Sequence, residues 1–231
     1  MLANIRSEAE TLELHKKILT AATALFIEKG FERTTIADIA KLSAIPKSKI
    51  LYEMKSKEDI LRMLVTKFLD GVTEASDAAS KQLTDDILLI FMANEVLQIY
   101  MAEMSEDMRN LYLAGYSMPK TSEAVLRRRS EILYEKFGYL FPSFALKDFY
   151  ELEIATMGIM RAYMSVPCDM YFTIEAKVDR LISTMLKIYD VDKATITRTR
   201  EFISKINFEE IANKAVADVF KDLEIKSAKK H

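Results

Sequence analysis

The sequence contains few of the residues on which metal sites, disulfides and covalent catalysis depend. Among its 231 residues there are one cysteine, Cys168, and two histidines, His15 and His231. A single cysteine excludes an intrachain disulfide and a cysteine-based zinc cluster, and two histidines are too few for a histidine-rich metal site. We also find no nucleophile beside a base and no glycine-rich phosphate loop. The sequence therefore predicts a protein that is not an enzyme and uses no metal or cofactor.

Glycine, proline and long apolar runs are scarce as well. Five Gly and four Pro in the chain favour long helices over a fold rich in turns. The densest apolar run, Ile87–Ala93, is followed by Asn94 and Glu95, and it falls far short of the ~20 residues that cross a bilayer. No basic stretch followed by an apolar one indicates a signal peptide. We therefore expect a cytoplasmic protein with no membrane partner.

The net charge of −2 conceals an uneven distribution. Residues 1–57 contain ten Lys or Arg and seven Asp or Glu, so the rest of the chain is net acidic. Within residues 41–57, five lysines accompany a single acid, Glu53. A basic patch at one end of an acidic chain is typical of a protein that holds a polyanion at that end, although a solvated lysine face would give the same count.

Two helices are predicted at the start of the chain. Apolar residues from Leu14 to Phe26 recur at spacings of three and four, which indicates a helix with one buried face. Gly30 is expected to end this helix, because glycine readily takes the left-handed conformation that follows a helix C-terminus. A second helix, over 36–42, is expected to begin after Thr35, whose hydroxyl and an acid three residues later nearly complete a capping box.

Two more helices follow at once. The connection 43–45 is only three residues long and leads into a short third helix over 46–54. Ser56 is then expected to cap a long fourth helix over 57–79. Short helices packed together, with the second and third joined by a three-residue turn, make up a helix-turn-helix unit.

The remainder of the chain also has helical periodicity, and no strand-like alternation is sustained anywhere. We therefore predict an all-α protein, with an N-terminal three-helix helix-turn-helix domain followed by a helical bundle. The helices expected in the bundle lie near Thr84–Glu103, Ser105–Tyr116, Lys120–Tyr139, Leu146–Val166, Ile174–Tyr189 and Asn207–Glu224. The polar tail Lys226–His231 is expected to be frayed.

One stretch of the sequence resembles a known DNA-binding domain. Residues 18–61 contain ILTAATALFIEKGFERTTIADIAKLS and, after the turn and short helix, YEMKSKEDIL. This order of motifs resembles the DNA-binding domain of the tetracycline-repressor (TetR) family of transcriptional regulators. The resemblance implies a DNA-binding domain over 1–57, joined by the helix 58–79 to an all-helical ligand-sensing and dimerisation domain within 58–231. It implies a homodimeric repressor that binds a palindromic double-stranded DNA operator and is released by a small-molecule effector.

The resemblance also implies which residues meet DNA. Two threonines at the start of the second helix would contact phosphate, the start of the third helix would face the major groove, and lysines after it would flank the backbone. The implied residues are Thr34, Thr35, Lys47, Ser48, Lys49, Leu51, Tyr52, Lys55 and Lys57. Alternatives remain open from the residues alone: the threonines could simply cap a helix, Leu51 could pack in the core, and the lysines could be solvated.

Some positions depart from the family's pattern. Ala44 stands where a turn glycine is common, so the turn must avoid positive φ or tolerate strain. Pro46 stands where a capping serine is common, and Ser48 where glycine is common. Glu53 could read a cytosine amino group, or it could pair with a lysine four residues away on either side. These departures leave open an alternative: a family member with a degenerate recognition helix that acts through a protein partner.

The dimer contact in this family is a four-helix bundle made by two late helices from each subunit. Ala155, Gly158 and Ala162 form a small-residue face that would let another helix approach closely, although the same face could pack within one subunit. The predicted interface residues are Ala155, Gly158, Ala162, Leu181, Met185 and Ile188. An amphipathic C-terminal helix with apolar positions from Ile211 to Leu223 could cover the body or enlarge this interface.

The effector site is predicted from composition and from the family. Methionine and tyrosine crowd the middle helices and could line an adaptable, mostly apolar cavity, although such residues are often ordinary core. The candidate ligand-binding residues are Met92, Tyr100, Met104, Met108, Tyr112, Tyr134, Met160 and Tyr163. Glu95 and Gln98 could orient a ligand or lie on an exposed surface. A mostly apolar small molecule is expected to act by shifting the fourth helix and hence the DNA-binding heads.

Overall fold

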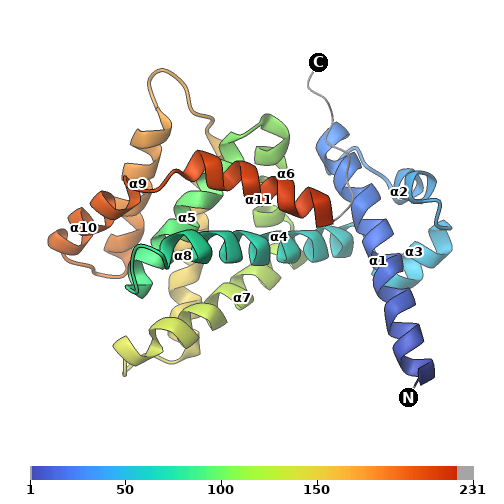
Figure 1. The fold of residues 1–231 in the computed structure, drawn as a ribbon, viewed down its shortest axis with the longest axis horizontal. Helices are drawn as coiled ribbons and strands as arrows, with labels where there is room; N and C mark the ends of the chain where they lie inside the picture. The colour runs from blue at the N-terminus through green and yellow to red at the C-terminus, as the bar shows by residue number, and fades with distance from the viewer. Residues whose placement is uncertain (1, 223–231) are drawn as a thin grey trace.

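The computed structural model describes residues 2–222, and every regular element in that range is a helix (Figure 1). In chain order the helices are α1 (Leu2–Lys29), α2 (Ile36–Ser43), α3 (Lys47–Met54), α4 (Lys57–Ser80), α5 (Ile87–Glu103), α6 (Glu106–Ser117), α7 (Pro119–Phe137), the 3-10 helix η1 (Gly138–Leu140), α8 (Leu146–Ser165), α9 (Ile174–Ile188), α10 (Lys193–Ile203) and α11 (Phe208–Asp222). The predicted all-α fold is confirmed. No helix in this range is long and apolar enough to cross a bilayer.

Helices α1, α2 and α3 form a head at one end of the molecule (Figure 1). Its core is built by fully buried residues from each helix, including Ile18, Ile39 and Ile50. Gly30 ends α1 with φ of 82°, and Thr35 caps α2 in a complete capping box, as the sequence predicts. The helix boundaries of the head are therefore set by local signals, and its buried residues are continuous with the core of the body.

The turn between α2 and α3 contains a strained residue. Ala44 has φ of 56° and ψ of 27°, which is left-handed backbone. Glycine is common at this position in the TetR-family pattern that the head resembles. A residue with a Cβ is disfavoured there by roughly 1–2 kcal/mol. The turn therefore tolerates positive φ instead of avoiding it.

Replacing Ala44 with glycine is expected to stabilise the chain. Glycine adopts this conformation without the Cβ clash, but it also gains more freedom in the unfolded chain, so the net increase in unfolding free energy should be about 0.5–1 kcal/mol. Urea unfolding followed by circular dichroism measures it. The variant Ala44→Val, which should lose stability, provides the opposite control; equal stabilities for all three proteins would contradict the strain.

Helix α4 connects the head to the body. Ser56 caps its start, and its buried face runs from Ile60 in the head to Val72 deep in the body. It packs against α1 at one end and against α5, α7 and α11 along the rest of its length. One continuous helix therefore touches both halves of the molecule, in agreement with the predicted range 57–79.

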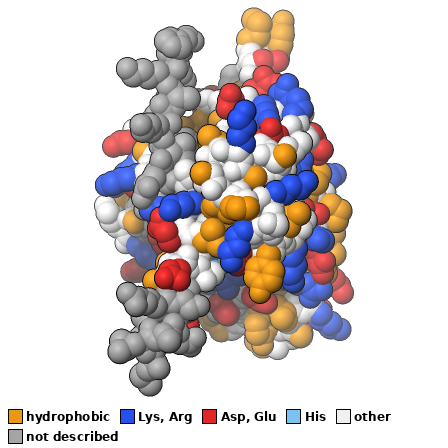
Figure 2. Space-filling model, turned by 90° about the vertical axis from the view of Figure 1, so that its right-hand side faces the viewer, with side chains coloured by type: hydrophobic (Ala, Val, Ile, Leu, Met, Phe, Trp, Pro, Cys, Tyr) orange, Lys and Arg blue, Asp and Glu red, His pale blue; other side chains and the backbone are white. Residues whose placement is uncertain are grey.

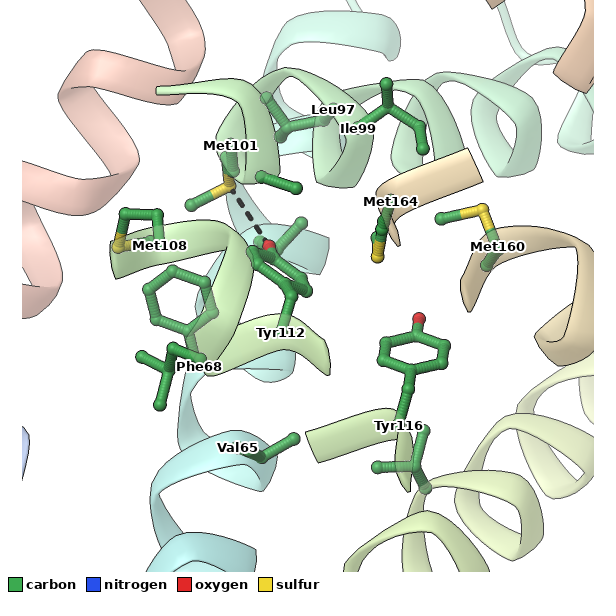
Figure 3. Packing of buried hydrophobic residues seen from close by; sticks show 14 of the residues in the cluster. Val65, Phe68, Leu97, Ile99, Met101, Met108, Tyr112, Tyr116, Met160 and Met164 are labelled. Atoms are coloured by element: carbon green, nitrogen blue, oxygen red, sulfur yellow. Dashed lines mark hydrogen bonds between the residues drawn. The ribbon is translucent and has the colours of Figure 1, made fainter. Parts of the chain in front are cut away.

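Helix α5 is the centre of the body. Its middle is closed off from solvent on all sides: Met92, Ala93, Val96, Leu97, Ile99, Met101 and Ala102 have no measurable exposure. Around it, methionine and tyrosine side chains from α6 and α8 point toward one another (Figure 3). The hydroxyl of Tyr112 donates to Sδ of Met101 at 3.6 Å, and its ring meets Phe68 of α4 edge to face.

The predicted helices differ from those observed at a few places. Helix α10 was not predicted, because its apolar residues are few; the cap formed by Asp192 with the amide of Thr195 is the signal that could have revealed it. Helix α1 begins at Leu2, well before Leu14. Part of the predicted C-terminal helix, Leu223 and Glu224, and the tail 226–231 lie outside the described residues.

Candidate nucleic-acid interface and body cavities

Helix α3 presents most of the predicted DNA-contact residues to solvent. Tyr52 is 78% exposed and Leu51 38% exposed, so neither is a core residue. Lys47, Ser48, Lys49 and Lys55 are exposed as well. Figure 2 looks onto the end of the molecule that carries the head, and it shows lysine and arginine side chains interspersed with hydrophobic ones. This surface combines positive charge with side chains able to contact base edges.

Glu53 on the same helix is occupied within the head. Its carboxylate lies 2.7 Å from Nζ of Lys49 and 3.3 Å from Nε2 of His15 on α1. The hydrogen bond from Lys49, followed by that from His15, lowers the pKa of Glu53. Of the alternatives open from sequence, the pairing with Lys49 is the one observed. The carboxylate is therefore neutralised by its neighbours and also anchors α3 to α1.

Two residues predicted to contact phosphate make hydrogen bonds within the head. Thr34 is only 1% exposed, and its hydroxyl donates to the carbonyl of Gly30 at 2.8 Å and to that of Leu25 at 3.2 Å. Lys57 donates from Nζ to the carbonyl of Phe31 at 2.7 Å and lies 4.2 Å from the centroid of that ring. Burial of Thr34 contradicts the prediction that it meets the DNA backbone. Lys57 helps to fix the loop between α1 and α2 but is only half-buried, so its phosphate contact stays a prediction.

Thr35 remains exposed and serves as the cap of α2. Its hydroxyl accepts from the amide of Asp38 and donates to the Asp38 carboxylate, which also pairs with Lys29 at 2.9 Å. These hydrogen bonds, with Lys29 first, hold the pKa of Asp38 far below its usual range. Capping does not exclude a phosphate contact, which stays a prediction for Thr35.

The body contains a buried ionic cluster at the meeting of α5, α7 and α8. Nε of Arg129 lies 2.6 Å from Glu153, and Nη1 lies 2.9 Å from Glu95. Glu153 also accepts hydrogen bonds from Thr156 at 2.8 Å and Tyr189 at 3.2 Å. Glu95 has no such additional donors among the described residues, and burial raises its pKa. The carboxyl of Glu95 is therefore the weaker partner of the guanidinium.

A cavity of about 60 Å³ adjoins this cluster, between α4, α5 and α7; its lining is mostly apolar, and it is called the polar cavity below because buried polar side chains stand in its wall. Glu95 and Arg129 line it, and Asn94 and Gln98 lie beside them. A chain of hydrogen bonds crosses its wall: Tyr116 donates to Gln98, Gln98 to Asn94, and Asn94 to Thr73 on α4. Glu95 and Gln98, which sequence left open as surface residues, are thus buried against a cavity.

Two further cavities lie in the body. One, of about 200 Å³, is apolar and is lined by aromatic residues including Phe91, Phe137 and Phe149, with Leu133. The other, of about 390 Å³, lies among α5, α9 and α11 and includes Tyr100 and Met104. The described part of the body therefore contains cavities with polar and with apolar walls.

Substituting Glu95 with glutamine should change how stability depends on pH. The folded-state pKa of Glu95 is raised from its ordinary value of 4.5, because burial disfavours the charged form. As pH rises through 4.5, the unfolded chain releases this proton while the folded chain keeps it, so stability falls until the folded-state pKa is passed. The stability of Glu95→Gln relative to wild type should therefore increase with pH across this window.

Urea unfolding at a series of pH values measures this difference. The exposed variant Glu151→Gln on α8 is a control that should follow the wild type. A stability difference between Glu95→Gln and wild type that stays constant with pH would contradict the raised pKa.

Comparison with known proteins matches the head to a described family. Residues 18–64 match the family model described as bacterial regulatory proteins, tetR family. The probable HTH-type transcriptional regulator YttP of Bacillus subtilis is 22% identical over 197 residues, which cover 84% of this chain and 88% of YttP. The regulator TtgR of Pseudomonas putida is 32% identical over 72 residues, or 31% of this chain and 32% of TtgR. The N-terminal head, residues 18–64, is therefore a tetR-family domain.

Solved TetR-family structures share the fold beyond the head. The crystal structure of RolR with the ligand resorcinol superposes with a TM-score of 0.64 at 17% identity and covers 86% of this chain and 97% of RolR. A TetR-family regulator from Pectobacterium atrosepticum has a TM-score of 0.53 at 16% identity and covers 78% of this chain and 93% of its own. At these identities the likeness concerns the fold alone.

Four of the eight residues predicted to bind an effector are core residues in the structure. Met92 and Met160 are fully buried, and Met108 and Tyr112 are 5% exposed. Tyr112 borders a space of about 20 Å³, which has room for about one water. Tyr134 is 45% exposed, and Tyr163 stacks on Phe172. Tyr100 and Met104 do line a cavity. Close packing around α5 corrects the prediction for the four buried residues, and ligand binding by Tyr134 and Tyr163 stays a prediction.

The predicted dimer residues divide between two environments. Leu181 and Met185 have no exposure and pack inside the subunit, so their prediction as interface residues is wrong, and Ile188 is half-buried. The apolar stripe of α9 serves the core of its own chain. Ala155, Gly158 and Ala162 on α8 are exposed, and a Cβ added at Gly158 would meet no atom within 4 Å. The small-residue face of α8 is therefore free to meet a second subunit.

Proposed function

We propose that this TetR-family transcriptional regulator binds a palindromic DNA operator as a homodimer in the cytoplasm and represses transcription until a small molecule releases it. The observation that carries the proposal is the exposed lysine and tyrosine surface of α3, held at one end of the molecule by α1 and α2. Lysines there supply affinity and register on phosphate, while Ser48, Leu51 and Tyr52 supply contact with base edges.

A dimer is required because the recognition helices of such regulators read two half-sites about one DNA turn, ~34–36 Å, apart. The exposed face of α8 supports a two-fold contact: its small residues allow a second helix to come close, and Ile154 adds apolar area at 54% exposure. The same face on both subunits would pack against itself.

Release by a ligand is supported by the position of α4. Glu58 near its start accepts a hydrogen bond from the amide of Lys120 at the start of α7, at 2.6 Å. Thr73, farther along α4, belongs to the hydrogen-bonded chain of the polar cavity. A ligand that prefers one arrangement of α4 and α7 would tilt the head and shift the spacing of the paired recognition helices. The resorcinol bound by RolR supports a small effector in a protein of this fold.

Selection from a random pool of duplex DNA tests the function. Purified full-length protein should enrich a palindrome with two half-sites. Failure to enrich any palindrome, with only salt-dependent binding to random DNA, would instead favour the protein-partner alternative. The Glu53 carboxylate, paired within the head, gives no repulsive charge that would favour that alternative.

The variant Gly158→Arg is expected to separate the subunits. Gly158 has open space around it within one subunit, so the folded monomer should accept arginine, whereas burying an unpaired charge in a two-fold interface should raise the dimer dissociation constant by about 10²-fold or more. Sedimentation analysis and thermal unfolding measure the two properties. Ala194→Arg, at an exposed site on α10, is the matched control; an unchanged dimer in both variants would place the interface elsewhere.

A further inference from the structure

Lys49 differs from the other exposed lysines of α3 and its end because it is held in an ion pair. Among the described residues, Lys47 and Lys55 form no ion pair. Nζ of Lys49 lies 2.7 Å from Oε1 of Glu53 and 5.3 Å from the centroid of the Tyr52 ring. The Lys49 side chain is 49% exposed, and an ion pair on so exposed a side chain is weak. Lys49 therefore lies between a carboxylate of its own helix and any phosphate that approaches α3.

His15 reaches the other oxygen of the same carboxylate from α1. Its Nε2 lies 3.3 Å from Oε2 of Glu53, and 25% of the histidine side chain and 15% of the glutamate side chain are exposed. A carboxylate only accepts hydrogen bonds, so Nε2 carries the hydrogen in the neutral ring. Protonation then occurs at Nδ1 and leaves this hydrogen bond in place, with a positive charge on the ring. Glu53 thus stands between a cation at the surface and an ionisable ring beneath it.

Glu53 is the charged group that His15 contacts. On α1 itself, the residues three and four positions away do not titrate; they are Thr11, Leu12, Ile18 and Leu19. Helices α2, α4 and α6 also pack against α1. Charged side chains of these helices are engaged elsewhere: Asp38 with Lys29, Lys57 with the carbonyl of Phe31, Asp59 with Ser56, and Arg109 with Glu103. Within the described part of the chain, a charge on His15 therefore acts on Glu53 and, through it, on Lys49.

Protonation of His15 changes the charge that these three side chains offer to DNA. While the ring is neutral, Lys49 and Glu53 cancel each other. Glu53 remains a carboxylate, because the hydrogen bonds from Lys49 and then from His15 lower its pKa. Histidine as a residue type gains its proton between about pH 5 and 8. Once the ring is protonated, one carboxylate faces two cations, so the group carries an excess positive charge and Glu53 holds Lys49 less strongly.

On the basis of the proposed function, we propose that His15 is a positioning residue for operator binding: its protonated ring holds Glu53 and releases Lys49 to a DNA phosphate. The acid form of the head gains one phosphate contact in each subunit, and the dimer gains two. Operator affinity therefore increases as pH falls through the range in which histidine takes up a proton. This role differs from that of an anchor between α1 and α3, which would not depend on the charge of the ring.

Operator affinity measured against pH tests this role. Fluorescence anisotropy of the full-length protein with the selected palindrome should show binding about tenfold tighter at about pH 5.5 than at about pH 8. The dependence of the logarithm of affinity on the logarithm of salt concentration should also be steeper at the lower pH. The expected increase in slope is about 2 for the dimer, because each added phosphate contact contributes about 0.9.

The two histidines of the chain provide a matched pair of variants. His15→Gln keeps a donor toward Glu53 but has no ionisable ring, so its affinity should change by less than about twofold between the two pH values. His231→Gln is the control and should keep the full change. Lys49→Ala should lose most of the change, because the side chain on which His15 acts is missing. Circular dichroism at both pH values establishes that each variant folds.

Two results would overturn the role of His15. One is an equal affinity of the wild type at the two pH values, and the other is a pH dependence that persists unchanged in His15→Gln or in Lys49→Ala. Failure of the proposed function is distinguishable, because it would appear as a selection that enriches no palindrome. The same pH comparison on random duplex DNA then tests His15 by itself, since phosphate contacts do not depend on sequence. An enriched palindrome bound without pH dependence refutes only the role of His15.

Discussion

Replacing Lys47, Lys49 and Lys55 together with alanine is expected to weaken operator binding by about 10³-fold at moderate salt. These lysines are exposed on or directly after α3, and none is needed for the core of the head. A dimer would lose six ammonium groups near phosphate. The logarithm of affinity should then depend less steeply on the logarithm of salt concentration, with a slope smaller by about 0.9 for each lost phosphate contact.

Fluorescence anisotropy with a labelled operator over a range of salt concentrations measures both quantities. Lys193→Ala at the start of α10, at the opposite end of the subunit, is the matched control and should leave the slope unchanged. Lys57→Ala should instead lower stability, because Lys57 fixes the loop after α1. A triple variant that retains the wild-type salt slope would show that α3 does not lie against DNA.

The variant Arg129→Met is expected to destabilise the chain by about 3–5 kcal/mol, because it leaves the buried Glu153 carboxylate without its counter-charge. Glu153 is fully buried, and the hydroxyls of Thr156 and Tyr189 cannot replace a cation. Unfolding in urea at neutral pH gives the change in free energy. The effect should exceed that of any single exposed ion pair, such as Arg127 with Glu123, by several-fold.

A second variant isolates the cause. Arg129→Met combined with Glu153→Gln removes both charges of the pair and should recover much of the lost stability, since the penalty arises from one unpaired ion and not from the missing attraction alone. This explanation would be contradicted if the stability losses of Arg129→Met and of Glu153→Gln simply added in the double variant.

The sequence predicted the head well because its signals are local. Gly30 ends a helix through its own backbone freedom, and Thr35 caps the next helix through a residue only three positions away. The same kind of reasoning did not place Thr34, whose hydroxyl turns back onto the end of α1, or Lys57, which α4 brings against the loop after α1. At such positions the same residue type suits a phosphate contact and a structural role within the head, so the sequence alone does not distinguish the two.

The body was predicted less completely, because helical periodicity shows that a face is apolar but not what covers it. The stripe of α9 around Leu181 fits an interface and a core equally well, and the structure assigns it to the core. Glu95 is the opposite case, because it is a charged residue within an apolar helix. Its burial depends on the ion pair with Arg129 of α7, a segment distant in the sequence. The polar cavity follows from this meeting of distant segments.

The position of Glu53 would also limit how the proposed operator preference can change in evolution. A residue at position 53 that turned to read a base would release His15 and Lys49 and loosen α3 from α1. Among the described residues, no comparable link from α3 to α1 is made by Ser48, Leu51 or Tyr52. Descendants of this chain that acquire new target sites are therefore expected to vary at these three positions and to keep the acid between them and α4.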